Sequence, residues 1–319
     1  MRRLNLILLA IACLFFVWVL QQVGWRTLGE HLRQVGWYWP LLLLPYGVVN
    51  LLECISWKYI LIKVPKKVTV SRLFWLRLGG EALNQLTPTA SLGGEPFKAT
   101  RLQADGVPLD RASASVVIHK GILVLSLSLY IFLGLALAPV YLPDALEHIA
   151  GLSLAALVLA AAGLTFVAVQ RTGPCGLVVR LFGKLGWCPG ILREKEDFLN
   201  DLDNTMSRFY RHHPGRAALA FSLFFLSWVI HAVEVYVIFM LLGHPIDWGL
   251  ALCLDALAML FTAMGFFIPA AAGVQEGGNL LLALGFDLGL TLGATFSILR
   301  RLREGFWLSL GLLVVWREK

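Results

Sequence analysis

Two stretches, LNQLTPTASLGGEP at residues 83–96 and GFFIPAAAGVQEGG at residues 265–278, decide how this chain folds. Each places a glutamate seven positions after a proline, with glycine between the two. Proline removes a backbone hydrogen-bond donor and glycine admits turns, so a helix that enters either stretch should break there. The pairs are Pro88 with Glu95 and Pro269 with Glu276.

The sequence around the two breaks is strongly apolar. Of 319 residues, 58% are hydrophobic and 15% are charged, against roughly 45–50% and about 25% in a typical soluble domain. Runs of about 20 apolar residues are long enough to cross a bilayer as helices. We therefore predict an all-α polytopic membrane bundle with two Pro/Gly-broken segments that are candidates for re-entrant hairpins. The runs are 4–23, 39–62, 112–138, 149–169, 217–242 and 249–268; region 277–316 is either one long tilted helix or a re-entrant piece followed by a helix.

The distribution of basic residues predicts the orientation, because Lys and Arg are retained on the cytoplasmic side. Segment 63–111 carries eight of them, whereas 139–148 carries none. We expect a multi-pass protein of the cytoplasmic (inner) cell membrane with a cytoplasmic N-terminus, and run 4–23 as a retained helix rather than a signal peptide. Topology and anionic lipid account for the net charge of +7 without nucleic acid as a partner.

Segment 170–214 is the one polar stretch long enough to divide the chain. It is predicted to be a cytoplasmic connector that contains an amphipathic helix, with apolar positions from Phe198 to Phe209 at helical spacing. The N-terminal half, 1–169, then holds the first motif at 79–101, and the C-terminal half, 215–319, holds the second at 265–285. Together they form one membrane domain.

Each motif is also followed by a basic residue inside an apolar helix. Lys120 comes 32 positions after the first proline, and Arg300 comes 31 after the second. Paired broken helices in corresponding positions are typical of substrate sites in secondary transporters. The alternative is a tight helix-packing turn at the cytoplasmic interface. For Lys120 and Arg303, a further alternative is that the long side chain reaches the cytoplasmic membrane surface.

Further ionisable residues within the apolar runs are costly to bury and usually face a cavity or one another. Each has two interpretations, a place in the substrate path or a hydrogen bond that joins helices. The spacing of His231 and Glu234 suits a hydrogen-bonded pair better than a metal site, and we predict neither metal nor cofactor. These residues are Glu53, His119, His231, Glu234, Asp255 and Arg301.

The first motif, from Arg77 through Glu95 to Arg101, resembles the lysylphosphatidylglycerol synthase transmembrane-region family, also called flippase-like. Its members include the membrane half of bacterial multiple-peptide-resistance factors and a hopanoid-associated branch, to which this chain is a candidate for assignment. The second motif, from Pro269 to Glu276 and on to Arg300, is similar to the family's C-terminal pattern. The resemblance implies movement of a phospholipid or lipid-linked substrate between leaflets. It does not imply aminoacyl transfer, which belongs to a soluble domain.

The first hypothesis is therefore a lipid flippase or transporter without enzymatic activity, whose partners are membrane lipids and for which lipid-synthesis enzymes are candidate partners. The alternatives are a membrane-embedded lipid-modifying enzyme and a non-catalytic scaffold for lipid or envelope synthesis. The sequence has no P-loop for nucleotide hydrolysis. The predicted substrate-binding residues are Asn84, Pro88, Gly93, Gly94, Glu95, Lys98, Arg101, Lys120, Pro269, Gly273, Glu276 and Arg300.

Overall fold

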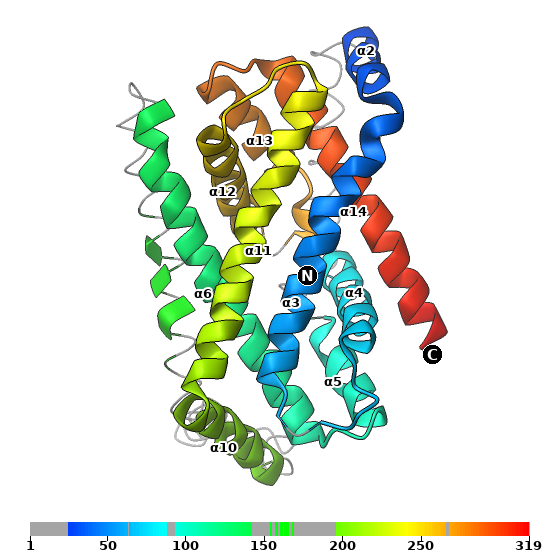
Figure 1. The fold of residues 1–319 in the computed structure, drawn as a ribbon, viewed down its shortest axis with the longest axis vertical. Helices are drawn as coiled ribbons and strands as arrows, with labels where there is room; N and C mark the ends of the chain where they lie inside the picture. The colour runs from blue at the N-terminus through cyan, green and yellow to red at the C-terminus, as the bar shows by residue number, and fades with distance from the viewer. Residues whose placement is uncertain are drawn as a thin grey trace, which may run out of the picture.

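The computed structural model describes residues 25–62, 64–87, 93–141, 196–265 and 268–318, with isolated residues between 154 and 168. Regular structure within these ranges is helical throughout (Figure 1). Pro88, run 4–23 and most of run 149–169 lie outside the described residues. The elements are α2 (Trp25–Val35), η1 (Gly36–Leu42), α3 (Leu43–Ile60), α4 (Val70–Leu86), α5 (Glu95–Ala104), α6 (Leu109–Tyr141), α10 (Glu196–His212), α11 (Pro214–Leu241), α12 (Trp248–Met264), η3 (Pro269–Ala271), α13 (Val274–Gly285) and α14 (Leu290–Arg317).

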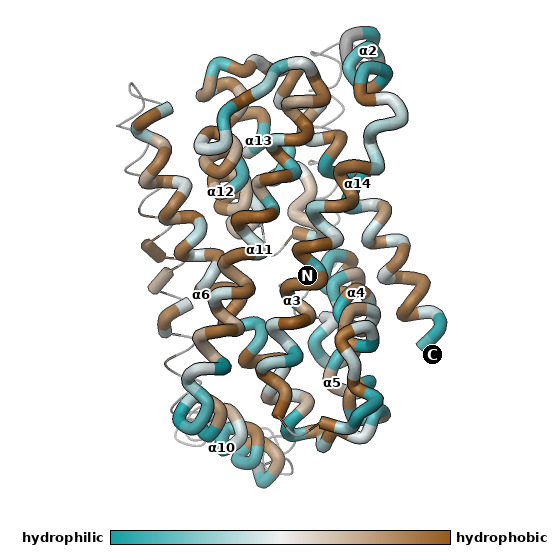
Figure 2. Tube along the Cα trace, viewed as in Figure 1, coloured by the Kyte–Doolittle hydropathy of each residue, from teal (hydrophilic) through white to brown (hydrophobic). Residues whose placement is uncertain are grey.

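Three helical stretches are long and apolar enough to cross a membrane: 29–60, 109–141 and 214–241. They coincide with three of the predicted runs, and Figure 2 shows that hydrophobic residues dominate the lengths of α6 and α11. At about 1.5 Å per residue, the 33 residues of α6 span roughly 50 Å. The multi-pass prediction agrees with these helices.

Region 277–316 contains a short helix, α13, followed by the long helix α14, rather than one continuous helix. The turn between them includes Asp287 and Gly289, with φ of 54° and 83°. Glycine adopts such positive φ values without steric cost, which allows the chain to reverse within four residues.

The membrane helices form two units with the same order of elements. In each unit a long helix (α3 or α11) leads to a helix of 17 residues (α4 or α12), a break, a short helix (α5 or α13) and a second long helix (α6 or α14). Figure 1 shows that corresponding helices run in opposite directions: α3 descends where α11 ascends, and α6 ascends where α14 descends. The two units are therefore inverted relative to each other.

The packing between the units has the same internal symmetry. Helix α3 packs against its counterpart α11, while α4 packs against α14 and α12 packs against α6. Glycines allow two of these close approaches. A Cβ on Gly311 would overlap the carbonyl oxygen of Leu78, and one on Gly134 would overlap the Cβ of Ala256. Each 17-residue helix is thus held by the last helix of the other unit.

Helix α10 lies at the lower end of the bundle in Figure 1 and is amphipathic, as the sequence pattern predicts. Leu202, Met206 and Phe209 are buried in a cluster with Ile118 of α6 and Phe224 of α11. The apolar face of this helix therefore packs on protein, while its polar face carries exposed charges.

Candidate functional site

The first break is organised by Asn84 and Glu95. The Asn84 side chain accepts a hydrogen bond from the backbone N–H of Gly94 at 2.7 Å and donates to Glu95 Oε1 at 3.1 Å. Gly94 must be glycine, because a Cβ there would overlap the carbonyl oxygen of Gly80. The end of α4 and the start of α5 are thereby held against each other.

The carboxylate of Glu95 also forms ion pairs with two lysines. Lys98 Nζ lies 2.7 Å from Glu95 Oε2 and 3.4 Å from Glu81 Oε1, and Lys120 Nζ of α6 lies 3.8 Å from Glu95 Oε1. Lys98 is almost fully buried, whereas the side chain of Lys120 is 18% exposed. Lys120 is thus the more accessible cation of this cluster.

The second break is organised by Glu276 in the same way. Its carboxylate accepts a hydrogen bond from the N–H of Gly273 at 2.7 Å and forms an ion pair with Arg301 Nε at 2.5 Å. Gly273 has a φ of 81°, which the residue before α13 needs for this turn. Arg301 also donates to the carbonyl of Ala270 and to Glu304. The guanidinium therefore ties both sides of the break to α14.

These contacts change the correspondence between the two motifs. Lys120 and Arg301 each lie 25 positions after the glutamate of their own motif, and each pairs with that glutamate. The structural counterpart of Lys120 is therefore Arg301. The neighbouring residue Arg300, which the loose sequence match pairs with Lys120, is displaced by one position along α14 and faces a different partner.

A second symmetric pair joins the helices that precede each break. Glu53 of α3 forms an ion pair with Arg77 of α4, and His231 Nδ1 of α11 lies 3.0 Å from Asp255 Oδ1 of α12. Both pairs are 24 positions apart in sequence. The acidic partner is on the first helix in one unit and on the second helix in the other, so the order of acidic and basic residues is reversed between the units.

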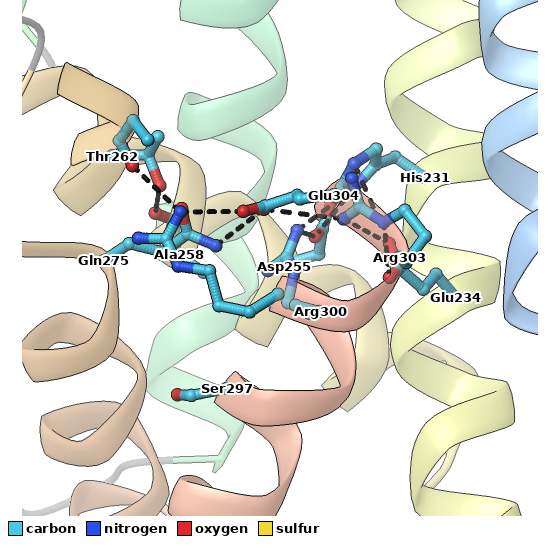
Figure 3. A network of polar contacts seen from close by, with 12 residues as sticks. His231, Glu234, Asp255, Ala258, Thr262, Gln275, Ser297, Arg300, Arg303 and Glu304 are labelled. Carbon is cyan, nitrogen blue, oxygen red and sulfur yellow. Dashed lines mark hydrogen bonds and ion pairs between the residues drawn. The ribbon is translucent and has the colours of Figure 1, made fainter. Parts of the chain in front are cut away.

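Arg300 points toward Asp255 rather than into open space. Its Nη2 donates to Asp255 Oδ1 at 2.9 Å (Figure 3). Tyr130 of α6 donates to Asp255 Oδ2 at 3.0 Å. Asp255 and Arg300 are fully buried. This cluster joins α6, α11, α12 and α14, which fits the interpretation that intramembrane charges connect helices.

Arg303 forms a bidentate ion pair with Glu234, with both N···O distances at 2.8 Å (Figure 3). Its guanidinium carbon also lies 4.2 Å from the ring centroid of Tyr46. Arg303 is only 2% exposed. The sequence-based alternative that it reaches the membrane surface is wrong, because the guanidinium is satisfied inside the bundle.

Between the two breaks lies a cavity of about 290 Å³. Both units contribute to it: Lys120 and Arg301, the cations of the two breaks, line it together. Apolar side chains such as Leu127 and Met259 complete its wall. The other charged or titratable lining residues are Tyr46, Glu53, Arg77, Glu81, His231, Arg303 and Glu304. A central, mixed apolar and charged cavity can accept an amphiphilic ligand that carries a polar head.

Of the predicted substrate-binding residues that the structure describes, only Asn84 and Lys120 line this cavity. Arg101 lies on α5 with its Nε 3.9 Å from Glu318 Oε2, close to the end of α14. There the Arg72 guanidinium holds the pKa of the Glu318 carboxyl below its usual value. His119 Nε2 lies 3.3 Å from the backbone oxygen of Glu53, and its ring packs against aromatic neighbours. The structure therefore gives Arg101 and His119 places outside the cavity lining.

Most residues that line the cavity were not among the predicted substrate-binding or intramembrane polar residues. The unpredicted ones include Arg77, Glu81, Gln275, Arg303 and Glu304. The repeated 24-residue separation could have identified Arg77, because it matches the spacing of His231 and Asp255. Within the part of the chain that the structure describes, no three His, Cys, Asp or Glu residues are placed to hold a metal ion.

An all-helical membrane protein, with two broken-helix units around a charged cavity, is the class of protein that this fold and site define. The chain belongs to the lysylphosphatidylglycerol synthase transmembrane-region family, whose sequence profile matches residues 5–311. It is also similar to the UPF0104 membrane protein MJ1595 of Methanocaldococcus jannaschii, with 21% identity over 312 residues that cover 93% of this chain and 89% of the relative.

The comparison with solved structures found no match. The matched family describes a transmembrane region, and no catalytic domain was detected. Neither comparison assigns the chain to the hopanoid-associated branch.

Proposed function

We propose that this protein moves a lipid with an anionic, phosphate-bearing headgroup between the two leaflets of the cell membrane. The observation that carries the proposal is the joint lining of one central cavity by Lys120 and Arg301, the cations that close the two breaks. A phosphate ester offers the charge that both side chains can bind. The apolar part of the wall suits the upper part of the acyl chains.

The dimensions of the short helices favour re-entrant hairpins. Helix α5 has 10 residues and α13 has 12, or about 15 and 18 Å, whereas a hydrocarbon core is about 30 Å thick. Neither helix can cross the core, so each hairpin would enter from one side and return to it. Broken backbone at that depth is tolerated where it lines a wet cavity.

The inverted arrangement suggests how a headgroup could reach either leaflet. Each break is bonded to a cation on its own long helix, through Glu95 with Lys120 and through Glu276 with Arg301. A phosphate that displaces one glutamate from its cation would loosen one hairpin and leave the other closed. Alternate release of the two hairpins would open the cavity to one side at a time.

The positive-inside distribution supports a cytoplasmic N-terminus and favours a cytoplasmic position for the end of the bundle that holds α5 and α10. Partners are then the lipids of both leaflets. Lipid-synthesis enzymes on the cytoplasmic side are further candidates for an association.

The direct test is lipid translocation in liposomes that contain the purified protein. Labelled phosphatidylglycerol should cross at least about tenfold faster than in empty liposomes. The Lys120→Met/Arg301→Met double variant should lose most of that acceleration, since two charge-assisted contacts are removed. Arg26→Met is the matched control, because Arg26 is exposed and its ion pair is with Glu30 on its own helix. No acceleration with phosphatidylglycerol, phosphatidylcholine or lipid phosphates would sink the proposal.

A further inference from the structure

A second pocket, of about 230 Å³, lies at the α10 end of the bundle and is separate from the central cavity. Its lining residues come mainly from the end of α3, the start of α6 and the second half of α10. These parts of the chain lie at the lower end of the bundle in Figure 1. The lining residues of the two cavities do not overlap. A ligand in this pocket would therefore not occupy the proposed transport site.

One part of the pocket wall is apolar, while Ser115 and Thr205 also line the pocket. Leu61, Ala114, Ile118 and Phe209 line it, and all four are buried in the surrounding hydrophobic clusters. The ring of Phe209 also contacts the neighbouring ring of Tyr210 on α10. These four side chains form a surface that an acyl chain can contact.

The rim of the same pocket is cationic. Arg111 of α6 and Arg208 of α10 line it with His213, and no carboxylate is among the lining residues. Neither arginine forms an ion pair within the described ranges, whereas the arginines of the bundle interior are paired with acids. The nearby Asp110 is engaged by the Thr205 hydroxyl at 3.4 Å. Two guanidinium groups thus remain available to an anion.

We propose that this pocket binds one anionic phospholipid of the adjacent leaflet, as a bound lipid that is not transported. The phosphate would be held by Arg111 and Arg208, and the glycerol and upper acyl chain would lie along the apolar wall. Arginine pairs with phosphate in a bidentate geometry. Such a lipid would bridge α6 and α10 and hold the connector helix against the membrane half.

The test is native mass spectrometry of the full chain in detergent with phosphatidylglycerol, phosphatidylcholine or inorganic phosphate. Wild type should retain phosphatidylglycerol in preference to phosphatidylcholine, and excess inorganic phosphate should not displace it. Arg111→Gln/Arg208→Gln should weaken one binding event at least about tenfold, the loss expected from removing charged hydrogen bonds. Lys66→Gln/Arg211→Gln is the control, since both residues are exposed at the same end and do not line the pocket.

The Lys120→Met/Arg301→Met variant distinguishes lipid binding in this pocket from lipid binding in the central cavity. It should keep the binding event that depends on Arg111 and Arg208. Equal retention by wild type and Arg111→Gln/Arg208→Gln would overturn the proposal. Displacement by inorganic phosphate would also overturn it, because the pocket would then be a phosphate site. Loss of the event in the control variant would point to a general effect of surface charge and would likewise contradict a specific lipid site.

Discussion

At the scale of single residues, the interior of this protein is organised by ion pairs between helices. Glu53 with Arg77, Asp255 with Arg300 and Glu234 with Arg303 are all buried. Removing one partner of a buried ion pair destabilises a protein far more than replacing both partners with apolar residues does. The pairs therefore act as constraints on which helices meet, because each cation needs its acid on the neighbouring helix.

The Glu234→Ala substitution should destabilise the protein by about 3 kcal/mol, because it removes the bidentate partner of the buried Arg303 guanidinium and leaves it only Glu304 Oε1 at 3.9 Å. Unfolding in mixed micelles with increasing denaturing detergent would measure the change. Glu30→Ala, which breaks an exposed pair with Arg26, should cost below about 0.5 kcal/mol. Equal effects of the two substitutions would contradict a structural role for the Glu234 pair.

Asp247 gives a prediction on pH dependence. It caps α12 by accepting from the N–H of Leu250 at 3.0 Å, and the Tyr141 hydroxyl donates to it at 2.6 Å. The hydrogen bond from Tyr141 holds the pKa of Asp247 below its usual value. The stabilisation is complete above the unfolded pKa of about 3.9 and is lost as pH falls through the folded value.

Tyr141→Phe should therefore raise the pKa of Asp247 toward its unfolded value, lower the stability at neutral pH and make the further loss of stability below about pH 4 smaller than in wild type. Thermal unfolding measured from pH 7 to pH 3 would reveal the change. Tyr38→Phe is a control in an exposed tyrosine of η1. Identical pH profiles for wild type and Tyr141→Phe would exclude a contribution from this hydrogen bond.

At the scale of elements, the two hairpins depend on close approach between helices. Helix α5 can pack on α4 because Gly94 lies against the carbonyl of Gly80. In the other unit, Gly278 of α13 faces the Phe261 side chain of α12, where an added Cβ would lie 2.5 Å from it. The first contact is with backbone, which cannot move aside as a side chain can.

Gly94→Ala should consequently open the first hairpin and destabilise the protein by at least about 2 kcal/mol, in the range of severe overpacking. It should also abolish transport, since Asn84 and Glu95 would no longer meet. Unfolding and translocation assays would measure both effects. Gly215→Ala is the matched control, because nothing lies within 4 Å of a Cβ at that position. A stable, active Gly94→Ala variant would show that the hairpin tolerates a wider separation.

At the scale of the whole molecule, the inverted arrangement predicts that corresponding ends of the two units face opposite sides of the membrane. Gln103 at the end of α5 and His244 between α11 and α12 are both exposed, and these two parts of the chain lie at opposite ends of the bundle. In a variant without native cysteines, a membrane-impermeant maleimide should label Gln103→Cys from one side of the membrane and His244→Cys from the other. Labelling of both from the same side would be incompatible with inverted units.

Much of the architecture could be predicted from the sequence. Apolar runs of sufficient length determined that the chain is an all-helical membrane protein, since only helices or closed barrels satisfy their backbone in lipid. The helix breaks were equally readable, because proline and glycine act on the local backbone. The amphipathic spacing from Phe198 to Phe209 likewise predicted helix α10, since the 3.6-residue period is a local property.

Tertiary structure alone decided which charges meet. Arg301 pairs with Glu276, while its neighbour Arg300 pairs with Asp255, because adjacent positions on a helix point about 100° apart and face different partners. The contacts of α4 with α14 and of α12 with α6, and hence the shared cavity, join helices that are far apart in the sequence. Local periodicity carries no information on those pairings, so the inverted orientation of the units emerged only from the folded molecule.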